Sequence, residues 1–439
     1  MNRYLSGLKE VFFFSLPLIA GQVGQMLFGI GDIVVAGRYS TEVVSALGIA
    51  TGIFAPFVMV GLGLTYAVSP IAAKYRGQGE EKEQILYTSL IGTAAAAFLL
   101  LMVFLIVIFN LSLFNFSPNI EALVYSYLKI CSISIIPLML FQTIKEYLQA
   151  FDLTYFANGT ILGFNVINVG LNIVLMFGLW GIPELGIQGA AWATTFSRTA
   201  MAILIYIYAQ KKITSERSLD RHLLKEITKL GIPISLGIFV EVLVFSFVTV
   251  IIGKMNIIAS ASHNIVLNLA SMTFMVPVAI SSAAAVKVGG EFGRSNNDGV
   301  LYYALASLSI TFLFMGFSAS CYFFFPESLI KLATPDQKLI EYGSGLLIFV
   351  ALFQIPDGLQ ITLLGILRGL GITKIPMLIT FAANWLIGLP IGLYLVNSRN
   401  MEAAGLWAGL AAGLSALFIG LSILFYNKYR NLQAVKLVS

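Results

Sequence analysis

Long apolar segments, separated by short polar ones, run along almost the whole of this 439-residue chain. A helix that crosses a lipid bilayer needs about 20 mostly apolar residues, and twelve stretches of the chain meet that requirement. They are residues 11–36, 45–73, 86–109, 123–148, 156–178, 187–209, 230–252, 257–286, 300–325, 343–367, 375–396 and 402–426. The pattern therefore predicts an all-α polytopic membrane protein with twelve transmembrane helices.

The first apolar segment is interpreted as a permanent span and not as a cleaved signal peptide. It continues from Val11 to about Ala36, whereas the apolar part of a signal peptide is only about 7–15 residues long. Composition supports a membrane protein, because 58% of the residues are hydrophobic and 11% are charged. A soluble domain has roughly a quarter of its residues charged. Cys131 and Cys321 lie within or beside apolar stretches and suggest neither a disulfide framework nor a metal site.

The positions of Lys and Arg predict which way the spans face, since cytoplasmic loops carry the excess. The longest polar connection, residues 210–229, contains six of them. With the N-terminus inside, 19 of the 26 Lys and Arg fall on the inner side, 5 on the outer side and 2, Lys129 and Arg198, within spans. We therefore expect both termini to be cytoplasmic.

Matching positions in the two halves of the chain indicate an internal duplication. At an offset of 216, Pro17 aligns with Pro233, Gly37 with Gly253 and Gly77 with Gly293; at 219, Pro137 aligns with Pro356, and Asn165 with Asn384. Six spans per copy give both copies the same orientation, so we expect a pseudo-twofold axis along the membrane normal, an arrangement common in secondary transporters. The predicted domains are a lobe of residues 1–209, a basic linker 210–229, a lobe 230–426 and a tail 427–439.

Three carboxylates are placed deep in predicted spans, namely Asp32, Glu241 and Asp357. A charged side chain at the bilayer centre costs at least about 2.5–3.5 kcal/mol, and such residues usually face a cavity or a partner. An acid without a basic partner can hold a proton or lie beside a bound cation. A purely structural role, with the carboxylate satisfied by hydrogen bonds, is the alternative.

Neutral polar side chains accompany these acids. Asn168 and Asn172 are four residues apart and share a helix face, so that with Thr194 they can supply neutral oxygens near Asp32, the kind of ligand that hard cations favour. Bridging between helices is the other reading of such asparagines. The remaining polar residues of the spans that we expect to line a substrate cavity are Gln22, Gln25, Asn165, Gln354 and Asn384.

Several motifs together resemble those of the multidrug and toxic compound extrusion (MATE) family. They are Gly29-Ile30-Gly31-Asp32-Ile33-Val34-Val35-Ala36-Gly37, Ser69-Pro70-Ile71-Ala72-Ala73 with Gly77 and Gly79, Glu241 eight residues after Pro233, Ala285 through Gly293, and Phe353-Gln354-Ile355-Pro356-Asp357-Gly358-Leu359-Gln360 with Leu367-Arg368-Gly369. Acids at both second-half positions make the chain similar to the NorM branch, not the DinF branch. The resemblance covers essentially the whole chain.

The resemblance implies two six-helix lobes and export of amphipathic, often cationic, drugs in exchange for Na⁺ or H⁺. By position, Asp32, Asn168, Asn172 and Thr194 would form a cation site in the first lobe, and Glu241 and Asp357 one in the second. It also implies a monomer in the bacterial inner membrane, with no cofactor, no metal other than possible Na⁺, and no nucleic-acid partner.

Two other functions compete with this one. A flippase for lipid-linked saccharides or peptidoglycan precursors would need several basic residues to hold phosphates, and Arg198 is the single deep cation that the sequence predicts. An intramembrane enzyme is disfavoured, because the two histidines, His222 and His263, form no recognisable metal or nucleophile motif.

Overall fold

The structure is a computed structural model that describes residues 2–80, 82–214 and 216–438, with the side chains of residues 6–80, 82–214 and 216–434. Residues 1 and 81 of the first predicted lobe, residue 215 of the predicted linker and residue 439 of the predicted tail lie outside the described residues. So do the side chains of Arg3 and Lys436, which were used to predict the orientation. The described chain is helical and contains no β-strand. The fold class predicted from the apolar pattern is confirmed.

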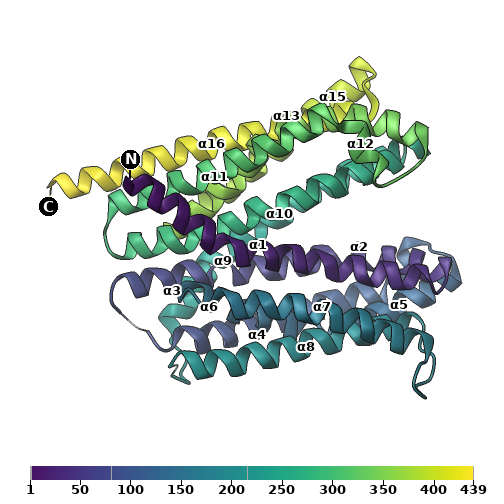
Figure 1. Cartoon of the computed structure of the whole chain (residues 1–439), viewed down its shortest axis with the longest axis horizontal. Coiled ribbons are helices and arrows are strands. Elements are labelled where there is room, and N and C mark those ends of the chain that lie inside the picture. Colours follow the sequence, from purple (N-terminus) through teal and green to yellow (C-terminus); the bar gives the residue numbers. More distant parts are fainter. Residues whose placement is uncertain (1, 81, 215, 439) are drawn as a thin grey trace. The chain divides into compact units, whose positions relative to one another are not determined.

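Each of the twelve predicted spans corresponds to a helix or to a run of successive helices (Figure 1). In the first half these are α1 (Asn2–Gly37), α2 (Thr41–Thr65) with α3 (Val68–Gly77), α4 (Ile85–Phe109), α5 (Pro118–Ile133) with α6 (Ile135–Ala150), α7 (Thr154–Phe177) and α8 (Ile187–Lys212). In the second half they are α9 (Arg221–Gly253), α10 (Ile257–Gly293), α11 (Asn297–Phe324), α13 (Gln337–Gly369), α14 (Lys374–Phe381) with η2 (Ala382–Gly388) and α15 (Leu389–Arg399), and α16 (Glu402–Val438). The short helices η1 (Leu111–Phe114) and α12 (Pro326–Lys331) lie in connections.

Most of these helices are apolar enough to cross a membrane without help from their neighbours. Among the described residues, ten helices meet this requirement by length and composition, and the pair α5 and α6 meets it jointly although it bends by 43° at the break. The one remaining span, α8, has 26 residues and is therefore long enough, but it is more polar than the others. Such a helix is stabilised in lipid by packing its polar residues against other helices.

Helix boundaries repeat at the positions that the duplication aligns. α1 ends at Gly37 and α9 ends at Gly253, its aligned partner. The next helix is capped in both copies by a polar side chain, Ser40 before α2 and Asn256 before α10, whose oxygen accepts a backbone N–H of the first turn. The first residues of α5 and α13 are also aligned partners, at the second of the two offsets. The two halves of the chain are thus built on one plan.

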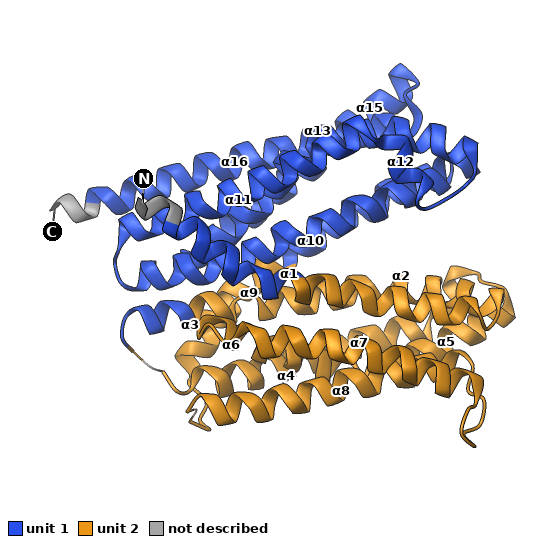
Figure 2. Cartoon of the chain, viewed as in Figure 1, with its two compact units in different colours: residues 1–19, 73–79, 236–439 blue, residues 20–72, 80–235 orange. Residues whose placement is uncertain are grey.

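Contacts divide the chain into two compact units that do not follow the predicted domain boundaries along the sequence (Figure 2). Unit 1 comprises residues 1–19, 73–79 and 236–439, and unit 2 comprises 20–72 and 80–235. Unit 1 therefore includes the start of α1 and the end of α3. The division into lobes 1–209 and 230–426 remains a prediction.

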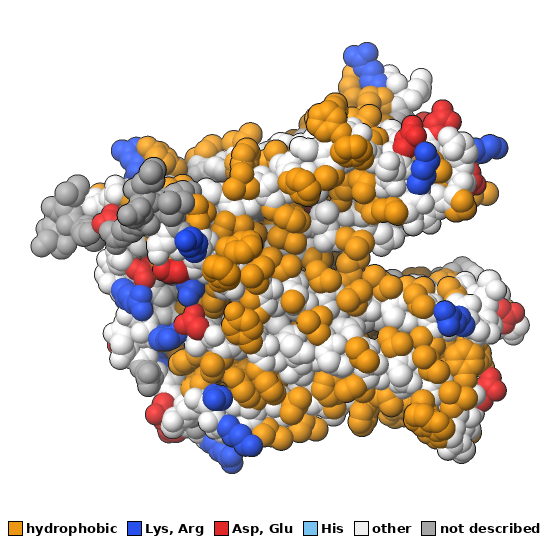
Figure 3. Space-filling view, in the orientation of Figure 1, with side chains coloured by type: hydrophobic (Ala, Val, Ile, Leu, Met, Phe, Trp, Pro, Cys, Tyr) orange, Lys and Arg blue, Asp and Glu red, His pale blue; other side chains and the backbone are white. Residues whose placement is uncertain are grey.

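Each unit has its own apolar core. In unit 2, buried side chains of α1, α2, α4, α5, α6, α7 and α8 form one cluster. In unit 1, α13 packs against α10, α11 and α16 (Figure 1), and two clusters surround it, one of which contains the ring of Trp407 stacked on Phe353. On the face shown in Figure 3, hydrophobic side chains cover the lengths of the helices, and charged ones gather near helix ends in both units. This is the surface expected of a protein whose solvent is lipid.

Within unit 1, the end of α3 packs against the end of α10 through two equivalent contacts, in each of which a glycine of one helix meets a backbone carbonyl of the other. A Cβ on Gly77 would overlap the carbonyl oxygen of Gly290, and a Cβ on Gly293 would overlap the carbonyl oxygen of Lys74. Lys74 and Gly290 are equivalent in the duplication, as are Gly77 and Gly293, so the duplication converts one contact into the other. Only glycine permits so close an approach of two backbones.

Candidate functional site

Four polar side chains converge inside unit 2, and they are the four predicted to form its cation site. Asp32 lies near the end of α1, Asn168 and Asn172 come from α7, and Thr194 comes from α8. Asn172 Nδ2 donates to Asp32 Oδ1 at 2.6 Å, and Thr194 Oγ1 donates to Asp32 Oδ2 at 3.1 Å. Asn172 Nδ2 also donates to Asn168 Oδ1 at 3.3 Å. Three helices that lie far apart in the sequence are thereby joined at one carboxylate.

This Asp32 cluster, defined as Asp32, Asn168, Asn172 and Thr194, is sealed from solvent within the described part of unit 2. Asp32 is 4% exposed, and the two asparagines are fully buried. The Oδ1 atom of Asn172 is buried and has no hydrogen-bond donor. A buried amide oxygen without a donor is unusual, and an ion or an ordered water commonly accounts for one. Carboxylate, amide and hydroxyl oxygens suit a small hard cation.

The positively charged side chain of Arg198 lies near this cluster. Arg198 lies one turn beyond Thr194 on α8, donates to Ser134 Oγ at 2.7 Å, and stacks over the ring of Phe54 at 5.3 Å. Its guanidinium interacts electrostatically with Asp32. Arg198, the deep cation that the sequence singled out, thus influences Asp32 without being among its hydrogen-bond donors, because helical spacing brings it to the face that carries Thr194.

The two deep acids of the second half meet within unit 1. Gln360 Nε2 lies 3.4 Å from Glu241 Oε1 on α9 and 3.4 Å from Asp357 Oδ1 on α13. Asp357 and Gln360 are buried, while Glu241 is half-buried. Two negative charges held on one amide repel each other, and a cation bound beside them would remove that repulsion.

Gln360 is the site residue that sequence reasoning missed. It occurs in the motif around Asp357 but received no role, although its spacing of three residues from Asp357 places both on one helix face. Its Oε1 atom is buried and has no hydrogen-bond donor. The donor-free amide oxygen of Asn172 in unit 2 thus has a counterpart beside the acids of unit 1.

The residues expected to line a substrate cavity make contacts between and within helices. Asn165 donates to the backbone of α1 at Gly24, at 2.8 Å, and Gln354 donates to hydroxyls of α10 and α11. Asn384 is buried in the π-helical segment η2 and donates to the carbonyl four residues earlier. Gln22 is buried, and Gln25 donates to Gln142 Oε1 at 3.2 Å. Their role in binding substrate remains a prediction.

Burial corrects the predicted count of enclosed charges. Glu146 and Glu291 are buried acids that the sequence did not single out, and Lys145 is a fully buried cation, whereas Arg198 and Glu241 are only half-buried. Glu291 is neutralised by Arg294, whose Nη1 lies 2.6 Å from its Oε1. These three buried residues lie in the last turns of α6 or α10, where the sequence suggested helix ends beside water. Packing, which composition does not reveal, covers them.

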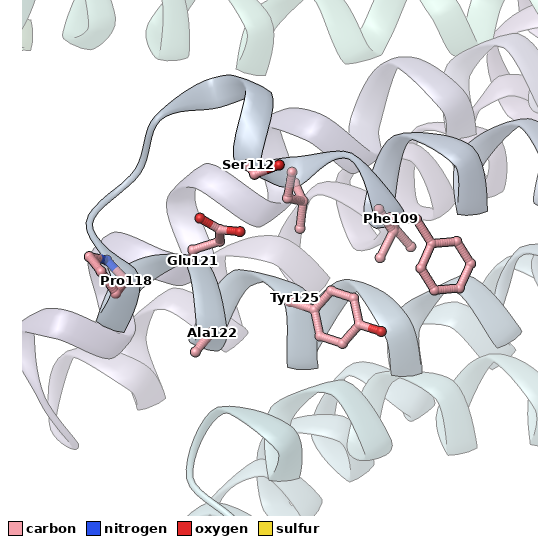
Figure 4. A pocket seen from close by; sticks show the side chains of 8 residues that line it. Phe109, Ser112, Pro118, Glu121, Ala122 and Tyr125 are labelled. Atoms are coloured by element: carbon pink, nitrogen blue, oxygen red, sulfur yellow. The ribbon is translucent and has the colours of Figure 1, made fainter.

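One surface pocket in unit 2 contains none of these residues. It lies where α4 and η1 meet α5 and is lined by side chains such as Phe109, Pro118, Glu121 and Tyr125 (Figure 4). It carries no part of the candidate site.

On the loops outside the spans, a single hydrogen bond stands out. Tyr39 Oη donates to Glu184 Oε1 at 2.6 Å and so ties the connection after α1 to the connection before α8. This hydrogen bond to a carboxylate raises the pKa of Tyr39 above its ordinary value of 10.0, because ionisation of the phenol would break it.

Comparison with known proteins shows which protein family shares this sequence pattern. The MatE family model matches the chain twice, over residues 17–177 and 233–394, and the two matches begin at Pro17 and Pro233, the pair that the duplication aligns. A curated relative, the multidrug resistance protein MdtK of Proteus mirabilis, is 28% identical over 95% of this chain and 94% of its own length.

Solved structures show the same fold. A eukaryotic MATE transporter superposes with a TM-score of 0.87 at 19% identity, covering 98% of this chain and 99% of the other. The MATE transporter VcmN of Vibrio cholerae, in its bent form, superposes with a TM-score of 0.89 at 16% identity, covering 99% of both chains. Identities this low extend the likeness to the fold alone.

Proposed function

This chain belongs to the MATE (MatE) family, and from that premise we propose that it is a secondary active multidrug exporter, which moves amphipathic and often cationic compounds out of the cell in exchange for Na⁺ or H⁺. Curated relatives along nearly the full length of the chain are named as multidrug resistance proteins. Alternating access, in which one site opens to each side of the membrane in turn, is the mechanism that duplicated transporters of this plan use.

The Asp32 cluster carries the proposal. Asp32 is a buried carboxylate surrounded by two amides and a hydroxyl, and one of those amides has an oxygen without a donor. A small cation that binds there is coordinated by the carboxylate and by that oxygen. Because the three helices α1, α7 and α8 each contribute a ligand, cation binding favours the conformation in which they are drawn together, and a ligand can shift an equilibrium only through such a difference in affinity.

The acids of unit 1 form a second coupling site in this proposal. Glu241 and Asp357 share the amide of Gln360 at equal distances. Removing the repulsion between them by a proton or Na⁺ changes how α9 and α13 pack, which gives the cation a differential affinity for one state. The oxygen ligands of both sites suit Na⁺ and H⁺ alike.

A flippase is the alternative function, and the buried cations do not favour it. Lys145 is a second enclosed cation in unit 2, but its neighbour in sequence is the buried acid Glu146. Arg198 already donates to Ser134 and covers Phe54. A cavity for phosphates would need several basic side chains available to the ligand.

An enzymatic role has no support from His263. Its ring is buried against that of Trp407, and its Nε2 atom lies 2.9 Å from the hydroxyl of Thr249. These contacts are those of a packed core histidine.

The proposed setting is the bacterial inner membrane, since the chain is a multi-pass membrane protein and its curated relatives are bacterial. Cytoplasmic termini and a monomeric state complete the proposal. The excess of Lys and Arg in the predicted inner segments supports the orientation.

Transport into proteoliposomes, with the Na⁺ gradient and the pH gradient imposed separately, tests the proposal. We expect Asp32→Asn and Asp357→Asn to lower gradient-driven drug transport at least about tenfold, the change that corresponds to about 1.4 kcal/mol of lost cation binding. Asp336→Asn is the matched control, because Asp336 is an exposed N-cap of α13 and Asn also caps helices. Unimpaired transport in both buried-acid variants, under either gradient, would contradict the proposed coupling.

A further inference from the structure

A second buried acid of unit 2 lies at the end of a row of polar side chains that begins near Asp32. Glu146 on α6 is 2% exposed, and three side chains donate hydrogen bonds to its carboxylate. Ser69 Oγ donates to its Oε2 at 2.6 Å, and Gln142 and Gln149 donate to its Oε1 at 3.0 and 3.3 Å. So many donors around one carboxylate mark a place prepared for negative charge.

The row reaches back from Glu146 to the face of α1 that carries Asp32. Gln142 Oε1 accepts from Gln25 Nε2 at 3.2 Å. Gln25 precedes Asp32 by seven positions, which is two helical turns on the same face, or about 10 Å along the helix. On this face of α1, Gln25 is therefore the next hydrogen-bonding side chain before Asp32, and hydrogen bonds lead from it through Gln142 to Glu146.

The two ends of this row have a feature in common. At the far end, Gln149 Oε1 is buried and has no donor, as Asn172 Oδ1 has none beside Asp32. Both ends of the row thus combine a buried carboxylate with an amide oxygen that lacks a donor.

We propose that Glu146 is a second cation-binding station of unit 2, which receives the Na⁺ released from Asp32 past the amide oxygens of Gln25 and Gln142. The inference rests on the proposed cation coupling at Asp32. Lys145, fully buried and adjacent to Glu146, interacts with it electrostatically. A resident ammonium group competes with an incoming cation, so occupancy of Glu146 is brief, as a transfer station requires.

The test compares two activities of full-length protein in proteoliposomes. Drug–drug exchange at equal cation concentrations needs no net cation movement, whereas gradient-driven efflux does. We expect Glu146→Gln to lower the ratio of gradient-driven efflux to exchange at least about tenfold, and Glu146→Asp, which keeps a carboxylate, to restore part of it. Glu291→Gln, a buried acid of unit 1 paired with Arg294, is the matched control and should leave the ratio unchanged.

Gln142→Met provides a second route to the answer if Glu146→Gln does not fold. It removes the link between Gln25 and Glu146 and leaves both acids in place, so it should lower the same ratio. A normal ratio in Glu146→Gln, or in Gln142→Met, overturns the inference. A buried acid with a purely structural role would lower thermal stability and leave the ratio unaltered.

Asp32→Asn, measured in parallel, separates this inference from the proposed function. A lowered ratio in Asp32→Asn with a normal ratio in Glu146→Gln overturns the inference alone. Normal ratios in both overturn the proposed coupling and the inference with it. A normal ratio in Asp32→Asn with a lowered one in Glu146→Gln overturns the transfer from Asp32. All ratios are measured with a Na⁺ gradient imposed and no pH gradient, so that Na⁺ is the cation transferred.

Discussion

Adding one methyl group at Gly293 should separate the end of α10 from the end of α3. A Cβ at this position would overlap the carbonyl oxygen of Lys74 and would lie 2.9 Å from its carbonyl carbon, whereas ordinary contact begins at 3.4 Å. Both atoms belong to the backbone, which cannot move aside as a flexible side chain can. The two helices must therefore move apart until these atoms reach ordinary contact.

The cost follows from what such overpacking does in other proteins. Forcing an extra carbon into a close-packed contact destabilises by about 1–3 kcal/mol. Gly290→Ala is the control, because its Cβ would approach nothing closer than the carbonyl oxygen of Ala73 at 3.8 Å. Gly→Ala gains up to about 1 kcal/mol of helix propensity in a helix interior, where Gly290 lies, and less at Gly293, the last residue of α10. The difference between the two variants is read with that offset.

That difference is measured by heating the purified protein in detergent and determining, by size-exclusion chromatography, the fraction that remains monodisperse at each temperature. We expect Gly293→Ala, and likewise Gly77→Ala, to unfold at a lower temperature than Gly290→Ala. Paired cysteines at the ends of α3 and α10 would report the separation directly through slower cross-linking. Equal midpoints for Gly293→Ala and Gly290→Ala would refute the reasoning, since the close backbone contact would then carry no energetic weight.

Three further predictions concern single hydrogen-bonding groups. Gln354→Leu should cost about 1–3 kcal/mol of stability by leaving two hydroxyls without their donor, yet leave transport per folded molecule unchanged; reduced transport with full stability would instead support a role in substrate binding. Gln360→Leu should lower gradient-driven transport about as much as loss of one of the two acids it joins, about tenfold, measured in proteoliposomes against Asp336→Asn. Tyr39 should stay protonated above pH 10.0, because the hydrogen bond to Glu184 raises its pKa. That bond is fully present below pH 10.0 and is lost as the pH rises through the folded-state pKa. The difference between ultraviolet titrations of wild type and Tyr39→Phe measures this pKa, and a midpoint at or below 10.0 would contradict the prediction.

The fold was predictable because lipid leaves few choices. A chain that must satisfy every backbone group inside a bilayer forms helices of one minimum length, and apolar runs reveal them. That Asn168 and Asn172 share a helix face was predictable for a related reason, since it follows from their spacing. Their meeting with Asp32 and Thr194, which lie on two other helices, was expected from the resemblance to the MATE family and not from spacing along one helix.

Contacts across helices were harder to predict. Hydropathy gives the depth of a residue along a span, but it does not show which neighbouring helix covers the residue. Lys145 and Glu146 lie near the end of α6, where sequence suggested exposure, and packing against other helices buries them. Gln360 was missed because its role depends on Glu241, which lies far earlier in the chain and meets it only in three dimensions.

The break between α5 and α6 gives the two duplicated halves different mechanical properties. In the first copy the helix is interrupted at Ser134 and bends by 43°, whereas in the second copy α13 runs unbroken through the equivalent position. Flexing the first copy at this joint sacrifices few helical hydrogen bonds, because the interruption has already forgone them, while flexing the second would require new ones to rupture. Arg198 donates to Ser134 at this break. The two copies therefore differ in how many backbone hydrogen bonds a further bend at this position would cost.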